Sequence, residues 1–159
     1  MPIFYEVIKA NSINIVHNHI RLPDTSSINT ESDINKEDKL AVLNLPDQVG
    51  ELNVAEAIAR FNDKSIFLTI ARRFHETEGP TADKIEAAIK AGDYQEARRL
   101  AHSLKGIASY IGAPQLAEVA GTLEEALTLS QFESLPVLLQ PVKTLLGRVM
   151  ENLVQLLNL

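Results

Sequence analysis

The sequence predicts an all-α protein, an antiparallel up-and-down four-helix bundle with one or two short accessory helices before it. Apolar residues recur at three- and four-residue steps from about residue 52 onward, as expected for helices that bury one face. No stretch alternates with period two, and no hairpin signal is present. The connections between the predicted helices are short, which favours antiparallel neighbours.

Two accessory helices are predicted first. Asn53 fits an N-cap, so a helix is expected over residues 54–61. The pair Asn62-Asp63 interrupts it, and the next helix is expected over residues 64–75 with one apolar side. His75 ends this second run, where an imidazole suits the negative end of a helix or simply faces water.

Four further helices form the predicted bundle. The first lies between Pro80, which suits an opening turn, and Gly92, which suits a C-terminal stop. The second begins at Asp93, three residues before Glu96 as in a capping box, and is expected to run to residue 111. This second helix is the central one of the sequence.

Proline residues mark the last two helices. Pro114 opens the third helix of the bundle. The fourth is expected over residues 134–157, where leucine and valine repeat with helical spacing. Pro141 does not fit the interior of a helix that begins at residue 134, so we expect a kink or a late start there.

Composition excludes several classes of protein. The 159 residues include no Cys, which rules out disulfides, thiolate metal sites and cysteine nucleophiles and fits a reducing cytoplasm. The formal net charge of −6 argues against nucleic-acid binding. No apolar run is long enough to span a membrane and no signal peptide is evident, so no direct membrane contact is expected.

Residues 1–48 differ from the rest and are expected to be a polar, flexible tail or linker, with the bundle spanning residues 49–159. Residues 23–39 are rich in Asp, Ser, Thr, Asn and Glu, which bury little surface. The apolar residues at 4–8 are compatible with a short strand or helix. His17 and His19 form a His-x-His pair without a third ligand nearby, so we interpret them as incidental and predict no metal site.

The central helix carries a polar face around His102. At about 100° per residue, the apolar residues form one stripe and His102 lies on the opposite side. The apolar stripe comprises Ala97, Leu100, Leu104, Ile107 and Ile111. The residues on or beside the polar face are Arg98, Arg99, Lys105, Gly106 and Ser109.

This polar face suits a histidine that carries a phosphoryl group. Neutral imidazole is a nucleophile near physiological pH, and the neighbouring Lys105 can neutralise phosphoryl oxygens. Gly106 costs about 1 kcal/mol in a helix relative to Ala, but the missing side chain lets another molecule approach the ring of His102. The alternative is an ordinary surface histidine, with the glycine serving close helix packing.

The motif His102-Ser103-Leu104-Lys105-Gly106, with Ala108 and Gly112-Ala113 after it, resembles the signature of histidine-containing phosphotransfer (HPt) domains. Gly92-Asp93 and the segments 97–101 and 123–127 are also similar to that family, and the likeness covers roughly residues 51–157. Such domains occur in phosphorelay proteins and in the C-terminal part of hybrid sensor histidine kinases.

The resemblance implies a role in two-component signalling. His102 would accept a phosphoryl group from a receiver-domain aspartate and pass it to another receiver, and the receiver would supply Mg²⁺. The chain has no Gly-rich ATP loop, so it is expected to be a phosphocarrier without a bound cofactor and not a kinase. The expected partners are response-regulator receiver domains, and we expect a monomer in the cytoplasm, for example as the cytosolic C-terminal domain of a membrane-bound sensor kinase.

Four polar residues are candidates for supporting His102. Arg98, Arg99 and Ser109 are candidates for orientation or docking, and solvated helix surface is an equal alternative for both arginines. By resemblance, Glu124 stands where some family members have a Gln that hydrogen-bonds the imidazole. Its carboxylate could accept that hydrogen bond and favour one tautomer, or it could point away.

Tyr110, Val54 and Ile58 are candidates for docking the partner, with core packing as the alternative and the favoured one for Ile58. Two other classes of function stay open beside the phosphorelay. One is an adaptor or structural bundle in which His102 is incidental. The other is a metal-dependent enzyme, against which the sequence shows no three-ligand cluster on facing helices.

Overall fold

The computed structural model describes residues 45–159. Most of the predicted tail, the apolar residues at 4–8 and the His17/His19 pair lie outside the described residues. The described α-helices are α3 (Val54–Phe61), α4 (Lys64–Glu78), α5 (Thr81–Lys90), α6 (Tyr94–Tyr110), α7 (Pro114–Thr128) and α8 (Leu135–Leu157). A short 3₁₀ helix, η3 (Phe132–Ser134), precedes α8.

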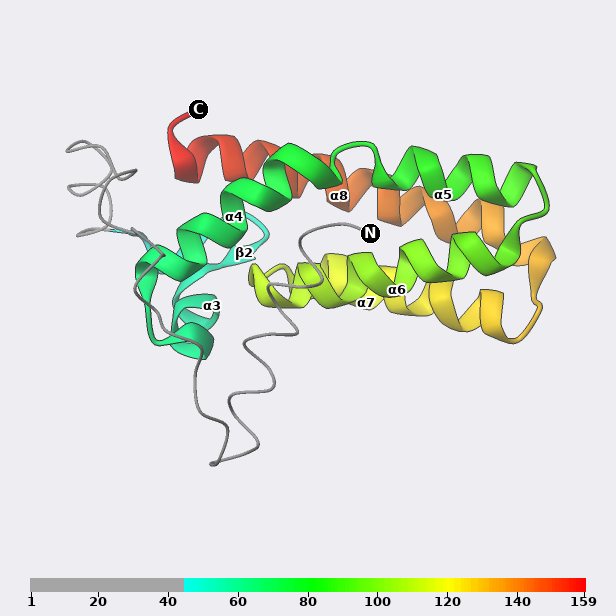
Figure 1. Ribbon diagram of the computed structural model, residues 1–159, viewed down its shortest axis with the longest axis horizontal. Coiled ribbons are helices and arrows are strands. Elements are labelled where there is room, and N and C mark those ends of the chain that lie inside the picture. The colour runs from blue at the N-terminus through cyan, green and yellow to red at the C-terminus, as the bar shows by residue number, and fades with distance from the viewer. Residues whose placement is uncertain (1–44) are drawn as a thin grey trace, which may run out of the picture. The chain divides into compact units, whose positions relative to one another are not determined.

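Helices α5 to α8 form an antiparallel four-helix bundle (Figure 1). Each packs against the next, and α8 closes the ring against α5. Only residues 91–93 separate α5 from α6, and only residues 111–113 separate α6 from α7. Helix α4 also packs along α8, and α3 contacts both α4 and α6. The predicted all-α fold class is confirmed, although α4, at 15 residues, is not short.

Polar side chains begin two helices at the predicted positions. The Asn53 Oδ1 accepts a hydrogen bond from the Glu56 N–H at 3.2 Å at the start of α3. The Asp93 Oδ1 accepts one from the Glu96 N–H at 3.0 Å at the start of α6. Only this half of the predicted capping box forms, because the Glu96 carboxylate pairs with Arg99 instead.

Helix α4 extends to Glu78, beyond the end predicted at His75. Its buried face continues through Phe74 to Glu78, whose carboxylate is buried. The Thr81 hydroxyl donates to this carboxylate at 2.7 Å, and the Thr77 hydroxyl, which also lies 2.8 Å from the Arg73 carbonyl, is 3.2 Å from it. These contacts compensate the burial of the acid in the extra turn.

Helix α8 begins at Leu135 and contains Pro141, so the alternative of a late start was wrong. Pro141 removes one backbone hydrogen bond from the helix. Its neighbours Leu139 and Val142 are buried in the core and hold the helix in place around it. Tertiary packing therefore outweighs the local preference against proline.

A two-stranded antiparallel ribbon, β1 (Gln48–Val49) and β2 (Leu52–Asn53), precedes α3 and was not predicted. Two residues in each strand are too few to show alternation in the sequence. Gly50, with φ +51°, lies in the turn between them. The Ala55 N–H donates to the carbonyl of Asp47 at 3.0 Å. Asp47 and Gln48, the first residue of β1, therefore belong to the folded part, although the predicted tail of residues 1–48 included them.

The core is largely aliphatic and lies between the helices of the bundle. Helix α6 buries one face through Ala97, Ala101, Leu104, Ile107 and Ala108. This burial fixes which side of α6 faces water. In the described part of the chain, no helix is both long and apolar enough to cross a membrane.

Candidate functional site

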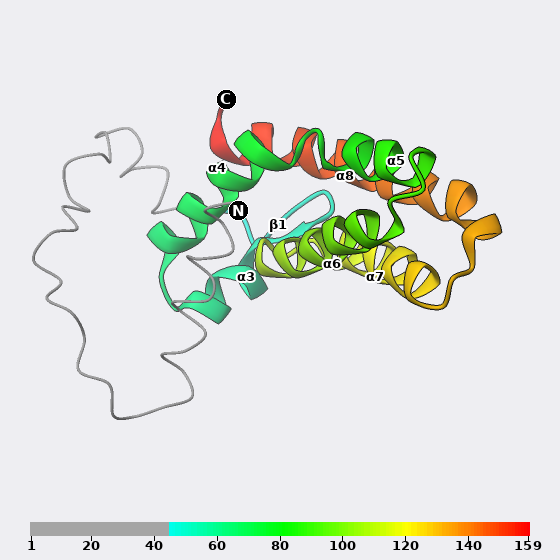
Figure 2. The same ribbon diagram turned by 45° about the vertical axis from the view of Figure 1, so that its right-hand side comes forward.

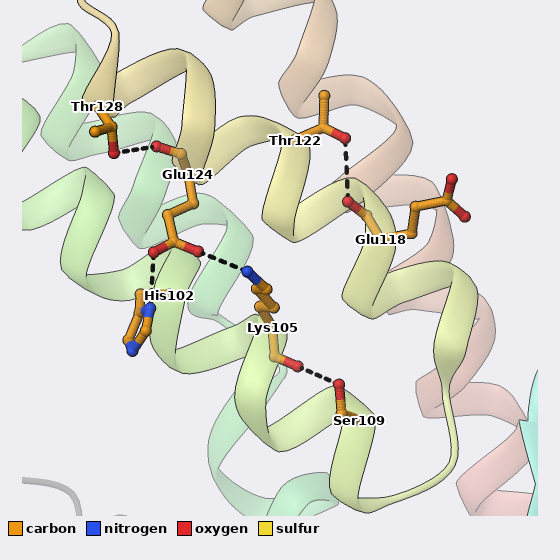
Figure 3. Close-up of polar contacts among 7 residues, drawn as sticks. All are labelled: His102, Lys105, Ser109, Glu118, Thr122, Glu124 and Thr128. Atoms are coloured by element: carbon orange, nitrogen blue, oxygen red, sulfur yellow. Dashed lines mark hydrogen bonds and ion pairs between the residues drawn. The ribbon is translucent and has the colours of Figure 1, made fainter.

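The candidate site lies on the outer face of α6, beside α7. Because α6 turns its apolar face inward, His102 stands on the outer side, and its side chain is 65% exposed. Figure 2 shows α7 running next to α6, and Figure 3 shows Glu124 reaching from α7 to the imidazole. The site is therefore built from two neighbouring helices of the bundle.

The Glu124 carboxylate bridges His102 and Lys105 (Figure 3). Its Oε1 lies 2.7 Å from the His102 Nδ1, and its Oε2 accepts a hydrogen bond from the Lys105 Nζ at 3.3 Å. Burial raises the pKa of the Glu124 carboxyl, but the hydrogen bonds from His102 and Lys105 outweigh burial and hold that pKa below its ordinary value of 4.5.

The bridge also fixes the tautomer of His102. An ionised carboxylate can only accept hydrogen bonds, so the Nδ1 of His102 must carry the proton. The lone pair of the neutral ring is then on Nε2, and the side chain that carries this nitrogen is exposed. Of the two orientations open to Glu124 from the sequence, the protein adopts the one toward the ring.

Gly121 of α7 makes room for Lys105, and its role was not predicted from the sequence. A Cβ at this position would lie 3.4 Å from both Cδ and Cε of Lys105, so the lysine side chain lies directly over the glycine. The pairing depends on how α6 and α7 pack, which the sequence of either helix alone does not reveal. The only signal in the sequence is the glycine itself, because a glycine inside a helix destabilises that helix relative to alanine and so suggests a packing role.

Gly106 and Ser109 continue the polar face toward the end of α6. A Cβ at Gly106 would meet nothing within 4 Å, so the space above this residue is open. The Ser109 hydroxyl donates to the Lys105 carbonyl at 3.0 Å. The hydroxyl is therefore engaged with its own helix and does not contact His102.

A depression of about 530 Å³ lies beside His102, toward the start of α6. Arg98, Arg99, His102 and Glu124 all line it. Two hydrogen bonds, at 2.6 and 2.7 Å, join the Arg99 guanidinium to the Glu96 carboxylate, lowering the pKa of Glu96 and raising that of Arg99. The Arg98 side chain is exposed and has no ion pair or hydrogen bond within the described residues.

The prediction that Val54 docks a partner was wrong, because its side chain is fully buried. Ile58 and Tyr110 are half-buried. The ring of Tyr110 stacks on that of Phe61, with centroids 5.9 Å apart, and so joins the end of α6 to α3. Of the three proposed docking residues, only these last two present any surface.

Residues 45–159 contain no group of three or more His, Asp or Glu side chains that could hold a metal ion. His75, the other histidine in this range, is half-buried in the last turn of α4. His102 is thus the histidine that the fold combines with a carboxylate, a cation and an open approach.

The fold and this site define a helical bundle that presents a hydrogen-bonded, exposed histidine. The family model of the Hpt domain matches residues 69–157, more than half of the chain, and the matched range contains both His102 and Glu124. The chain belongs to the Hpt domain family. Hpt domains are phosphocarriers of two-component phosphorelays and interact with the receiver domains of response regulators. Comparisons with curated proteins and with solved structures gave no match.

Proposed function

We propose that His102 accepts a phosphoryl group from the aspartyl phosphate of a receiver domain and passes it to the aspartate of another receiver. One observation carries the proposal. The imidazole is 65% exposed while its Nδ1 is held 2.7 Å from the Glu124 carboxylate, which leaves Nε2 as the nucleophile. The resemblance of the surrounding motif to the Hpt signature supports the same residue.

In the proposed step, the Nε2 lone pair attacks phosphorus, and the bond between phosphorus and the aspartate oxygen breaks. The aspartate leaves as a carboxylate. Because Nδ1 keeps its proton, the phosphorylated ring gains positive charge, and the Glu124 carboxylate stabilises it. Transfer to the second receiver runs through the same states in reverse. Positioning and charge neutralisation supply most of the catalysis, and the receiver would contribute the Mg²⁺.

Lys105 and Gly106 support this step in different ways. Lys105 offsets the negative charge of Glu124, which would otherwise repel the incoming phosphoryl group. A direct contact of Lys105 with the phosphoryl oxygens stays a prediction, because the hydrogen bond to Glu124 uses only one of the three N–H donors of the ammonium. The open space above Gly106 admits the active-site loop of the receiver.

The setting of the relay is part of the proposal. The partners would be receiver domains, met transiently by a monomer in the cytoplasm. A hybrid sensor kinase anchored in a membrane would be one such setting, in which the polar residues 23–39 act as a linker.

The experiment is transfer from a phosphorylated receiver to the full chain. The expected product carries a label that is labile in acid and stable in base, as a phosphoramidate bond to histidine is. His102→Gln should abolish the label, because the other histidine within residues 45–159, His75, lies on α4 outside the site. His75→Gln is the matched control, since it removes a histidine of α4 outside the site, and it should transfer at the wild-type rate.

Two results would contradict the proposal. Transfer that persists in His102→Gln would assign the phosphoryl group to another residue. No transfer to the wild-type chain from any of a panel of phosphorylated receivers would favour an adaptor bundle in which His102 is incidental.

A further inference from the structure

The imidazole of His102 leans away from Lys105. Side chains on an α-helix tilt toward the helix N-terminus, so the ring of His102 covers the turn before it and not the turn that carries Lys105. Figure 3 shows the second ring nitrogen pointing away from the Lys105 amino group. The depression beside the ring also lies toward the start of α6, because Arg98 and Arg99 line it and Lys105 does not.

The cations around the ring differ in how far they are already neutralised. Lys105 is 3.3 Å from the Glu124 carboxylate, and Arg99 is bound by two hydrogen bonds to Glu96. Arg98 is exposed, lines the depression with His102 and has no carboxylate partner among the described residues. A phosphoryl group on Nε2 would therefore meet Arg98 as the uncompensated positive charge on its side of the ring.

We propose that Arg98 is the residue that binds the phosphoryl oxygens on His102, through its guanidinium, while Lys105 acts by holding Glu124. The inference rests on the proposed function, because it needs a phosphoryl group at His102 Nε2. A guanidinium presents several N–H donors in a planar fork that matches phosphate oxygens. Arg98 precedes His102 by one helical turn, about 6 Å along the axis, which is within reach of an arginine side chain.

Three carboxylates line the same depression, and two of them are already paired, Glu96 with Arg99 and Glu124 with His102 and Lys105. The third is Asp93, which has no ion pair among the described residues. Asp93 lies nine residues before His102, about 13 Å along the helix, which exceeds the screening length of about 8 Å at physiological salt. Its carboxylate also accepts the Glu96 N–H at the positive end of α6. Asp93 is thus too distant and too well compensated to cancel Arg98 at the ring.

The test uses phosphoramidate, a small donor that phosphorylates imidazole directly and so removes receiver docking from the measurement. The full chain is treated as wild type, Arg98→Gln, Arg98→Lys, Lys105→Gln and Arg73→Gln. Arg73→Gln is the matched control, because it removes an exposed arginine of α4 outside the site. The readouts are the rate of phosphorylation at the His102 peptide and the ³¹P-detected pKa of the attached phosphoryl group.

Arg98→Gln should slow phosphorylation about fivefold at low salt, as expected for losing one favourable charge pair at a surface, and the difference should shrink at high salt. It should also raise the pKa of the phosphoryl group, because a nearby cation favours the dianion. Arg98→Lys should bring both the phosphorylation rate and the phosphoryl pKa most of the way back to the wild-type values, and Arg73→Gln should match wild type. A purely structural role for Arg98 would leave the phosphoryl pKa unmoved.

The inference is overturned if Arg98→Gln behaves like Arg73→Gln while wild type is phosphorylated at His102. It is also overturned if Lys105→Gln raises the phosphoryl pKa while Arg98→Gln leaves it unchanged, since Arg98 would then not be the cation at the phosphoryl oxygens. The proposed function fails in a different way, when transfer from a receiver does not depend on His102.

Discussion

At the scale of single residues, the site is one carboxylate shared by an imidazole and an ammonium. His102, Lys105 and Gly106 could be predicted because they lie at fixed offsets on one helix, and helix geometry alone gives their common face. The orientation of Glu124 could not be predicted, because it depends on the rotation of α7 against α6. The buried position of Val54 was missed for the same reason, since its burial comes from long-range packing.

The sharing of Glu124 leads to a prediction about Lys105. Lys105→Gln should slow transfer several-fold, because it leaves the carboxylate uncompensated beside the phosphoryl group. In a Glu124→Gln background, the same change should have a much smaller effect, because there is no longer a charge to offset. Rates of the four proteins of this double-mutant cycle measure the coupling. Strictly additive effects would show that Lys105 does not act through Glu124.

At the scale of elements, the site depends on the close packing of α6 against α7. Lys105 reaches Glu124 by lying over Gly121, where α7 has no side chain. The helix limits themselves were largely predictable, since capping residues and glycines mark them in the sequence. Glu78 and Pro141 are the exceptions, because buried contacts extend α4 and carry α8 through a proline.

Gly121→Leu should slow transfer, because its side chain would occupy the space of the Lys105 stem and separate the ammonium from Glu124. Gly121→Ala should be tolerated, since its Cβ would make an ordinary contact at 3.4 Å, and should stabilise the helix by up to about 1 kcal/mol. Gly147→Leu in α8 is the control, because a Cβ there meets nothing within 4 Å. Equal transfer rates for the two leucine variants would contradict the packing role of Gly121.

At the scale of the whole molecule, the bundle closes where α8 returns to α5. Lys143 of α8 lies 3.0 Å from the Glu86 carboxylate and 3.3 Å from that of Asp83, both on α5. The hydrogen bond that Lys143 donates to Glu86 holds the pKa of Glu86 below its ordinary value of 4.5, and the same hydrogen bond raises the pKa of Lys143. The ring of four helices could be predicted from short connections, but the ion pairs that join its first and last members could not.

The lowered pKa of Glu86 sets the pH range in which this pair contributes to stability. The contribution is fully present above pH 4.5 and is lost as the pH falls through the folded-state pKa. Urea unfolding should therefore find wild type more stable than Glu86→Gln at pH 7, with the difference disappearing in acid. The exposed Glu151→Gln serves as control. A difference that stayed constant from pH 7 to below pH 4 would mean that Glu86 acts through its shape and not its charge.

The most direct test of the account is to locate the bond between phosphorus and the protein after transfer from a receiver. A ³¹P–¹⁵N correlation spectrum of the phosphorylated, ¹⁵N-labelled chain identifies the nitrogen that carries the phosphoryl group. With Nδ1 of His102 held by Glu124, the account predicts a single bond to Nε2 of His102. Phosphorus on Nδ1 of His102, or on any other residue, would contradict it.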